Sequence, residues 1–111
     1  MERSIYEFPA IFRRVQLERP GEIGAETAFM RAIWQRHRKR PVSRVLDIAC
    51  GSSPHGQLFA RTGIAVVGID RSPVMLMTAR EENASIPNLH FYRRNIERFS
   101  LPERPFDAAY L

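Results

Sequence analysis

The fold of this chain is decided by the stretch Val45-Leu46-Asp47-Ile48-Ala49-Cys50-Gly51-Ser52-Ser53-Pro54. It begins as a short apolar run and continues as a turn of small residues that ends in Ser-Pro. Short, nearly continuous apolar runs are typical of strands that are buried on both faces of a parallel sheet. Serine at an N-cap, followed by proline at the first helical position, is a helix start signal. The stretch therefore predicts a buried strand, a tight turn and a helix.

The same pattern repeats along the chain. Further apolar runs predict strands at 65–69, 89–92 and 108–111. The first intervening helix is expected to end at Gly63, and the second to begin at Ser72-Pro73 and continue to about Ala84. Strands and helices that alternate over short connections predict an α/β fold with a parallel sheet and flanking helices.

The sequence predicts two parts: a helical lead-in over residues 1–41 and the α/β domain over residues 42–111. Residues 1–20 are expected to hold at most one short helix. A helix is expected over 22–39, with Phe29 and Trp34 packed in the core and Pro41 as its stop. The evidence for this helix is an apolar stripe at helical spacing, formed by Ala25, Phe29, Ala32 and Ile33.

Composition excludes several classes of protein. The 111 residues suit one globular domain, and the lack of an apolar run of about 18 residues or an apolar signal core predicts a cytoplasmic protein without a membrane partner. The single cysteine, Cys50, excludes an internal disulfide and a cysteine-built zinc site. The histidines do not cluster in sequence, so no metal site is predicted; they are His37, His55 and His90.

The net charge of +5 leaves nucleic-acid binding open. The arginines are scattered along the chain, which favours a compositional origin over a dedicated binding surface. The dense run Arg36-His37-Arg38-Lys39-Arg40 falls at the expected end of a helix, where cations complement the helix dipole. A basic module that binds RNA or a partner therefore remains an alternative.

Ligands of open α/β sheets bind at the carboxyl ends of the strands. Asp47 stands near the end of the first predicted strand, and Asp70 follows the second, nineteen residues after Gly51. An acidic side chain at this second place can accept both hydroxyls of a ribose, while a turn of small residues lets a ligand approach the backbone. The pattern predicts a nucleoside-type ligand.

Three such ligands compete. Gly51 and Gly56 have the spacing of a P-loop, but Gln57 replaces its lysine, which excludes that loop. No window between Ala49 and Gly63 fits G-x-G-x-x-G, so a dinucleotide module is only an alternative. S-adenosylmethionine has a ribose and an adenine but no phosphate, and the two acidic strand ends and the small-residue turn suit it.

The stretch resembles the cofactor-binding half of class I S-adenosylmethionine-dependent methyltransferases over residues 42–111. Residues 47–53 are similar to that family's D-x-G-x-G-x-G motif, and Val67-Gly68-Ile69-Asp70 to its acidic second-strand end. Asn95-Ile96 and Phe106-Asp107-Ala108-Ala109-Tyr110 are similar to its next two motifs. The resemblance implies a Rossmann-like sheet, methyl transfer and S-adenosylmethionine as cofactor.

Two departures from the motif affect the turn. Ala49 stands at the first glycine, where one added methyl group is expected to be a mild change. Ser53 stands at the third glycine, where serine would cost free energy if the position needs a positive φ. The binding loop is therefore expected to differ in shape or to bind more weakly.

For the methionine end of the cofactor, the resemblance implies contacts in the turn and at the fourth strand. Asp47 and the backbone of Ala49 would hold the ammonium, and Gly51 would let the cofactor lie against the turn. Tyr110 would lie under the methionine part. The same resemblance includes two neighbouring residues of the turn in the site, Cys50 and Ser52.

For the nucleoside end, the resemblance implies that Asp70 takes the ribose hydroxyls and that Arg71 lies beside the adenine. Asn95 would hydrogen-bond the adenine edge, Ile96 would pack on its face, and Tyr6 would cover the cofactor. Two of these residues have structural alternatives. Asp70 could cap the following helix, and Asn95 could be only a turn former.

The resemblance also implies about seven strands, of which this chain would supply about four. The chain is therefore expected to be the N-terminal part of a methyltransferase, cut after the fourth strand and inactive alone. A small molecule is the expected methyl acceptor, with nucleic acid not favoured. No catalytic residue is predicted, and the oligomeric state is left open.

Overall fold

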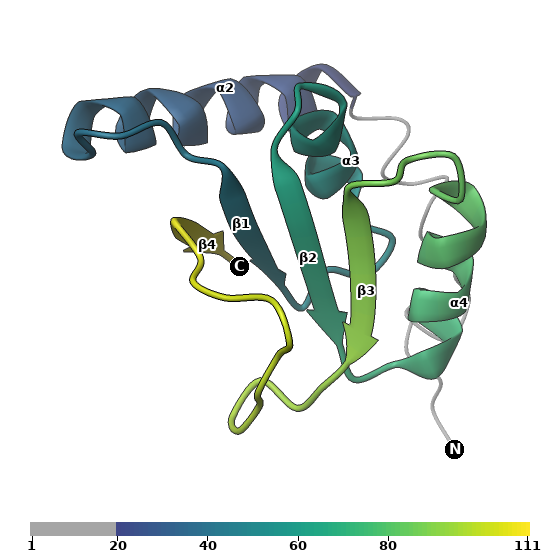
Figure 1. Ribbon diagram of the computed structural model, residues 1–111. Helices are drawn as coiled ribbons and strands as arrows, with labels where there is room; N and C mark the ends of the chain where they lie inside the picture. The colour runs from purple at the N-terminus through teal and green to yellow at the C-terminus, as the bar shows by residue number, and fades with distance from the viewer. Residues whose placement is uncertain (1–19) are drawn as a thin grey trace.

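The computed structural model describes residues 20–111, so Tyr6 and the short helix considered for the first residues of the lead-in fall outside the described part (Figure 1). The described elements follow in the order α2 (Pro20–His37), β1 (Arg44–Ile48), α3 (Pro54–Arg61), β2 (Ala65–Asp70), α4 (Pro73–Glu82), β3 (Leu89–Arg93) and β4 (Ala108–Tyr110). The strands form one parallel sheet in the order β3-β2-β1-β4. The predicted α/β fold is confirmed.

The centre of the sheet is apolar because β1 and β2 are covered on both faces. The two strands pair in register from Arg44 opposite Ala65 to Ile48 opposite Ile69. Val45 and Val66 are fully buried. Continuous apolar runs therefore form these strands, as expected for buried parallel strands.

The three helices pack on one face of the sheet. Phe59 of α3 and Leu76 of α4 meet Val66 and Phe91 there, in a cluster that Trp34 of α2 also contacts. Gly68 of β2 lies under this cluster, and a Cβ at Gly68 would come within 2.8 Å of the Phe91 ring. This glycine lets the neighbouring rings approach the strand closely.

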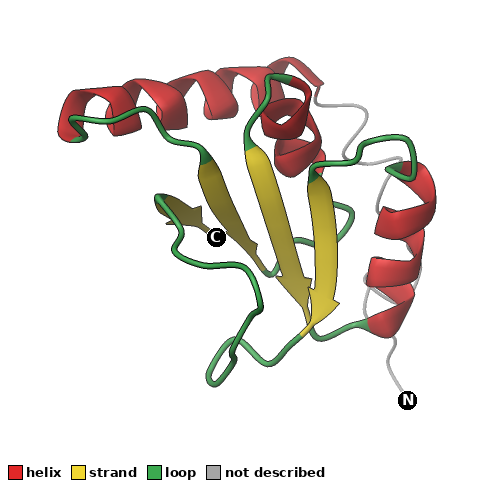
Figure 2. Cartoon of the chain, in the orientation of Figure 1, coloured by secondary structure: helices red, strands yellow, loops and turns green. Residues whose placement is uncertain are grey.

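The other face of the sheet is covered by the loop between β3 and β4 (Figure 2). Leu46, Val67 and Ile69 form the sheet side of this second cluster, and Leu101 and Phe106 pack on it from the loop. β4 pairs only with β1 and is an edge strand of the described sheet.

The face of α2 that points to the core differs from the prediction. Phe29 is 66% exposed and Ile33 is 40% exposed, while Thr27 is buried. Trp34 packs as predicted, with its ring centroid 5.1 Å from that of Phe59. α2 packs mainly on α3, and Met30 and Trp34 are its side chains that contact the core cluster. None of the helices within residues 20–111 is long and apolar enough to cross a membrane.

The two predicted Ser-Pro helix starts behave differently. The Ser72 hydroxyl accepts a hydrogen bond from the Met75 amide at 3.2 Å, which is the predicted cap. Ser53 occupies the N-cap position of α3, but its hydroxyl makes no cap bond and donates to Asp47 instead. Ser53 and Pro54 therefore begin α3 as predicted, but the Ser53 side chain bonds Asp47 and not the helix end. Gly63, with φ of +95°, follows α3 as predicted.

Asp107 fixes the start of β4 against the start of β1. Its Oδ2 accepts bonds from the Ser43 amide at 2.7 Å, the Ser43 hydroxyl at 2.8 Å and the Arg44 amide at 2.9 Å. Its Oδ1 accepts from Arg38 at 3.1 Å. The bonds from Ser43, assisted by those from Arg44 and by the Arg38 charge, lower the pKa of Asp107 to about 2.

Replacing Asp107 with Asn is expected to lower the free energy of unfolding by about 1–3 kcal/mol, because an amide cannot accept all four bonds. The stabilisation from Asp107 is complete above the unfolded pKa of 3.8 and is lost as the pH falls through about 2. Urea unfolding at neutral and at acid pH measures both effects. The exposed Glu81→Gln variant is the control, and equal stability of Asp107→Asn and wild type would contradict the assignment.

Candidate functional site

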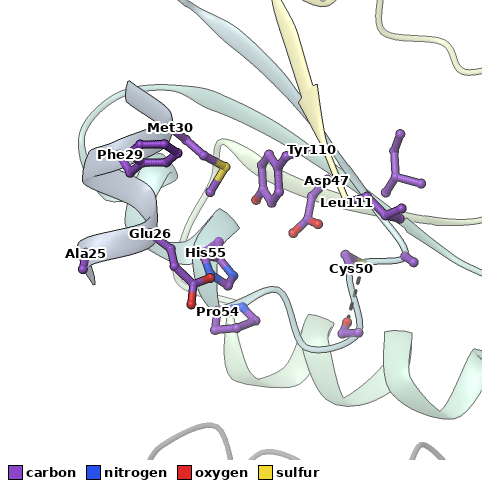
Figure 3. A pocket seen from close by; sticks show the side chains of 13 residues that line it. Ala25, Glu26, Phe29, Met30, Asp47, Cys50, Pro54, His55, Tyr110 and Leu111 are labelled. Carbon is purple, nitrogen blue, oxygen red and sulfur yellow. Dashed lines mark hydrogen bonds and ion pairs between the residues drawn. The ribbon is translucent and has the colours of Figure 1, made fainter. Parts of the chain in front are cut away.

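A pocket of about 560 Å³ opens at the carboxyl end of β1 (Figure 3). It lies between the turn after β1, the start of α3, the first half of α2 and the end of β4. Small-molecule sites span roughly 300–1,000 Å³, so a nucleoside-sized ligand is within its range. The lining residues are Ala25, Glu26, Phe29, Met30, Asp47, Ile48, Ala49, Cys50, Gly51, Pro54, His55, Tyr110 and Leu111.

The turn after β1 has three residues in the left-handed region. The φ angles are +55° at Ala49, +55° at Gly51 and +57° at Ser53. For a residue with a side chain, this region costs about 1–2 kcal/mol. The expectation that alanine is a mild change at position 49 was therefore wrong, and Ser53 carries the strain that a positive φ imposes.

Asp47 lies at the base of the pocket and is only 5% exposed. Its Oδ2 accepts a hydrogen bond of 2.6 Å from the Ser53 hydroxyl. Burial raises the pKa of Asp47 to about 6, although the Ser53 bond, Tyr110 and His55 act to lower it. A cationic group in the pocket would favour the charged form of this carboxylate.

Tyr110 stands beside Asp47 at the end of β4 (Figure 3). Its ring packs 5.5 Å from the Phe59 ring and 6.2 Å from the His55 ring, measured between centroids. Burial and the nearby Asp47 charge raise the pKa of its hydroxyl. This hydroxyl is buried and meets hydrogen-bond geometry with no group in the described part of the chain. Because buried polar groups are nearly always bonded, the hydroxyl indicates a place for a ligand or a water.

Asp70 couples the end of β2 to the turn after β1. Its Oδ2 accepts from the Gly51 amide and its Oδ1 from the Ser72 amide, both at 2.9 Å. The Cys50 amide also donates to the Ile69 carbonyl at 2.9 Å. Each carboxylate oxygen can accept two bonds, so Asp70 keeps acceptor capacity for a ligand.

The outer wall of the pocket comes from α2 and the start of α3. His55 Nε2 lies 2.8 Å from Glu26 Oε2, which ties the two helices together. Phe29 and Met30 add apolar surface from α2 (Figure 3). The pocket thus has the Asp47 carboxylate at its floor and a largely apolar outer wall.

Similarity to known protein families shows which family this chain belongs to. Residues 45–111, which include the whole sheet and the turn after β1, match the family described as a methyltransferase domain. This chain belongs to the methyltransferase domain family. The predicted resemblance to class I S-adenosylmethionine-dependent methyltransferases is confirmed, and the sheet is the corresponding part of their Rossmann-like fold.

Individual methyltransferases resemble the domain over parts of their length. Demethylmenaquinone methyltransferase of Tropheryma whipplei is 39% identical over 64 residues, which are 58% of this chain and 26% of that protein. DesVI of Streptomyces venezuelae is 25% identical, with a TM-score of 0.74 over 98% of this chain and 43% of its own. CalS10 of Micromonospora echinaspora, an amino pentose methyltransferase solved with S-adenosylmethionine bound, is 26% identical, with a TM-score of 0.68 over 98% of this chain and 42% of its own. The chain therefore spans about a quarter to two fifths of these proteins.

Half of the predicted site residues of this methyltransferase domain line the pocket together: Asp47, Ala49, Cys50, Gly51 and Tyr110. Ser52 is fully buried behind the turn and does not line it. Asp70 adjoins the pocket through its bond to Gly51.

The remaining predicted residues lie outside the pocket lining. Arg71 and Asn95 are exposed, and Ile96 is 50% exposed. Asn95 Oδ1 accepts a bond from the Glu97 amide at 3.0 Å, which is the geometry of a turn former. The structural alternative for Asp70 is also present, because this carboxylate holds the Ser72 amide.

The α2 wall of the pocket was not predicted from the sequence. Phe29 was assigned to the core, and Ala25 was part of the same apolar stripe. The apolar spacing correctly indicated a helix face that is not simply exposed to solvent. It could not distinguish packing against the sheet from the lining of a pocket.

Two other chemistries receive no support from the described residues. No group of three or more His, Cys, Asp or Glu side chains within residues 20–111 is arranged to hold a metal ion. Burial raises the pKa of the Cys50 thiol, which opposes thiolate formation and a role as nucleophile.

Two variants at position 53 separate the strain of the turn from its hydrogen bond. Ser53→Ala removes the hydroxyl and keeps a side chain at positive φ, whereas Ser53→Gly removes both. Both should raise the pKa of Asp47 above about 6, and Ser53→Gly should be more stable than Ser53→Ala by about 1 kcal/mol. Carbon-13 NMR titration and urea unfolding measure the two quantities. An unchanged pKa would show that the bond is unimportant, and equal stability would show an unstrained turn.

Proposed function

We propose that this methyltransferase domain binds S-adenosylmethionine in the pocket after β1 and transfers its methyl group to a small-molecule acceptor. The observation that carries the proposal is the buried Asp47 carboxylate in the pocket, with the buried Tyr110 hydroxyl beside it. CalS10 is an amino pentose methyltransferase, and this similarity supports a small acceptor. Because the chain spans less than half of its relatives, its complete activity is part of the proposal.

The methionine end of the cofactor fits the base of the pocket. Its ammonium would pair with Asp47, whose charged form burial now disfavours. The Tyr110 hydroxyl offers a donor and an acceptor beside that carboxylate. The turn over 49–53 presents backbone to the ligand at Ala49 and Gly51.

The nucleoside end would extend toward the carboxyl end of β2. There Asp70 would accept the ribose hydroxyls with the oxygen capacity that Gly51 and Ser72 leave. Arg71 would lie beside the adenine, and Ile96 would cover its face. Asn95 would reach the adenine edge only after exchanging its present bond to the Glu97 amide.

The chemistry is the displacement of a methyl group from a sulfonium, a reactivity that the cofactor supplies when bound. The chain contributes binding and alignment. Asp47 and Asp70 hold the two ends of the ligand, and the Tyr110 ring and the α2 wall limit the access of water. Phe29 and Met30 place apolar surface where an acceptor would enter.

The first test is a thermal melt of the chain with S-adenosylhomocysteine, NAD or ATP, each in excess. A ligand that binds only the folded state raises the midpoint, and we expect a rise with S-adenosylhomocysteine alone. A cooperative melt that none of the three ligands shifts would contradict the proposal.

Asp47→Asn separates binding from stability. The variant should melt at or above the wild-type midpoint, because burial disfavours the charge that it removes and the amide oxygen can still accept from Ser53. It should lose the rise with S-adenosylhomocysteine. Glu81→Gln, which changes an exposed carboxylate on α4, should keep that rise. A normal rise in Asp47→Asn would remove Asp47 from the site.

The pH dependence follows from the raised pKa of Asp47. Folding raises this pKa above its unfolded value, so the charge of Asp47 opposes folding increasingly as the pH rises from 3.8 through about 6. An ammonium needs the charged carboxylate, so the affinity for S-adenosylhomocysteine should fall as the pH drops below about 6. Calorimetric titration between about pH 5 and 8 measures it. An affinity independent of pH over that range would exclude pairing with Asp47.

A further inference from the structure

A second cavity, of about 400 Å³, lies beside the connection between α2 and β1. Its walls come from the second half of α2, from residues 38–42 and from Thr62 and Ile64 after α3. The connection enters β1 at its amino end, whereas the methyltransferase pocket opens at the carboxyl end (Figure 1). The two cavities share no lining residue and are separate sites.

The lining of this second cavity is strongly basic. It contains no acidic residue and four cationic side chains: Arg31, Arg38, Lys39 and Arg40. The sequence has no Asp or Glu between Glu26 and Asp47. Like charges close together repel, and an anion between them relieves the repulsion. The composition of the cavity therefore favours an anionic ligand.

Two of the cations are already held in place. Arg38 donates to the Asp107 carbonyl at 2.8 Å and to its carboxylate at 3.1 Å, which balances part of its charge. Arg31 donates to the Thr62 hydroxyl, and its guanidinium lies 5.7 Å from the centroid of the Phe59 ring. These bonds orient the two side chains before any ligand arrives, which reduces the entropy cost of binding.

The other two cations are exposed. The side chains of Lys39 and Arg40 make no hydrogen bond or ion pair within residues 20–111. The helix dipole does not account for the group, because its effect is confined to the last turn. Arg31 lies six residues before the end of α2 at His37, and Arg40 lies beyond it.

An aromatic side chain completes the cavity. Trp34 lines it and is partly exposed, while its ring also packs on Phe59. Cations that track a phosphate backbone, combined with an aromatic ring on which a base can stack, are the pattern of proteins that bind single-stranded nucleic acid. Here the tertiary structure collects the two kinds of side chain around one cavity.

We propose that this basic cavity binds the phosphate backbone of single-stranded nucleic acid, with the exposed Lys39 and Arg40 as phosphate contacts and Trp34 as a stacking surface. This binding site goes beyond the proposed methyl transfer and does not depend on it. Its affinity should be unchanged in Asp47→Asn, which distinguishes its failure from failure of the cofactor proposal.

The test is the binding of a short labelled oligouridylate, followed by fluorescence anisotropy at salt concentrations from about 50 to 200 mM. Lys39→Gln/Arg40→Gln should bind at least about tenfold more weakly and lower the salt slope by about 1.4, since each phosphate contact contributes about 0.7. The control is Arg98→Gln/Arg104→Gln, which removes the same charge from exposed residues of the β3–β4 loop. Its affinity should stay within about twofold of wild type.

The emission of Trp34 provides a second readout, because it is the only tryptophan in the chain. Oligouridylate should quench this emission in the wild type and less in Lys39→Gln/Arg40→Gln. Arg40→Gln alone repeats the comparison with a smaller change, and circular dichroism confirms that each variant is folded. The proposal is overturned if wild type does not bind at about 50 mM salt, if both double variants lose affinity equally, or if binding leaves Trp34 emission unchanged.

Discussion

The hydrogen bond from the Ser53 hydroxyl to the buried Asp47 carboxylate is the interaction on which the pocket depends. It holds a serine at positive φ and gives a buried charge its closest donor. It also fixes how closely α3 approaches β1. A Cβ at Gly56 would lie 2.2 Å from the Ser53 hydroxyl and 3.4 Å from the Asp47 carboxylate, so only glycine fits there. The turn, the start of α3 and the base of the pocket are therefore one unit.

Two acidic side chains meet at one end of the sheet, and a basic cavity lies at the other end. Asp47 and Asp70 meet at the carboxyl ends of β1 and β2, where Asp70 also raises the pKa of Asp47. Arg38, Lys39 and Arg40 gather at the opposite end. A buried carboxylate and left-handed residues with side chains both oppose folding, and proteins tolerate such features where a site needs them. Their concentration in the turn after β1 agrees with a site for a cationic ligand at that end.

Much of this architecture follows from local sequence. Apolar runs predicted all four strands, because residues buried on both sides must be apolar. Ser72 and Gly63 marked a helix start and a helix end correctly, since capping and positive φ involve only neighbouring residues. The acidic residues at the strand ends could also be recognised from the sequence. Parallel topology brings the carboxyl ends of the strands to one edge of the sheet, so residues that follow different strands lie near each other.

The sequence by itself thus determined the order of the elements, the family and the edge of the sheet at which the pocket opens. Only the tertiary structure decided what each side chain meets. The apolar spacing of α2 is the same whether Phe29 faces a core or a pocket, and the packing of α2 on α3 selected the pocket. Ser53 could cap a helix or donate to Asp47, and the position of β1 selected the donor bond. Arg31 and Arg40 are nine residues apart in sequence, and they line one cavity because the chain turns back after α2.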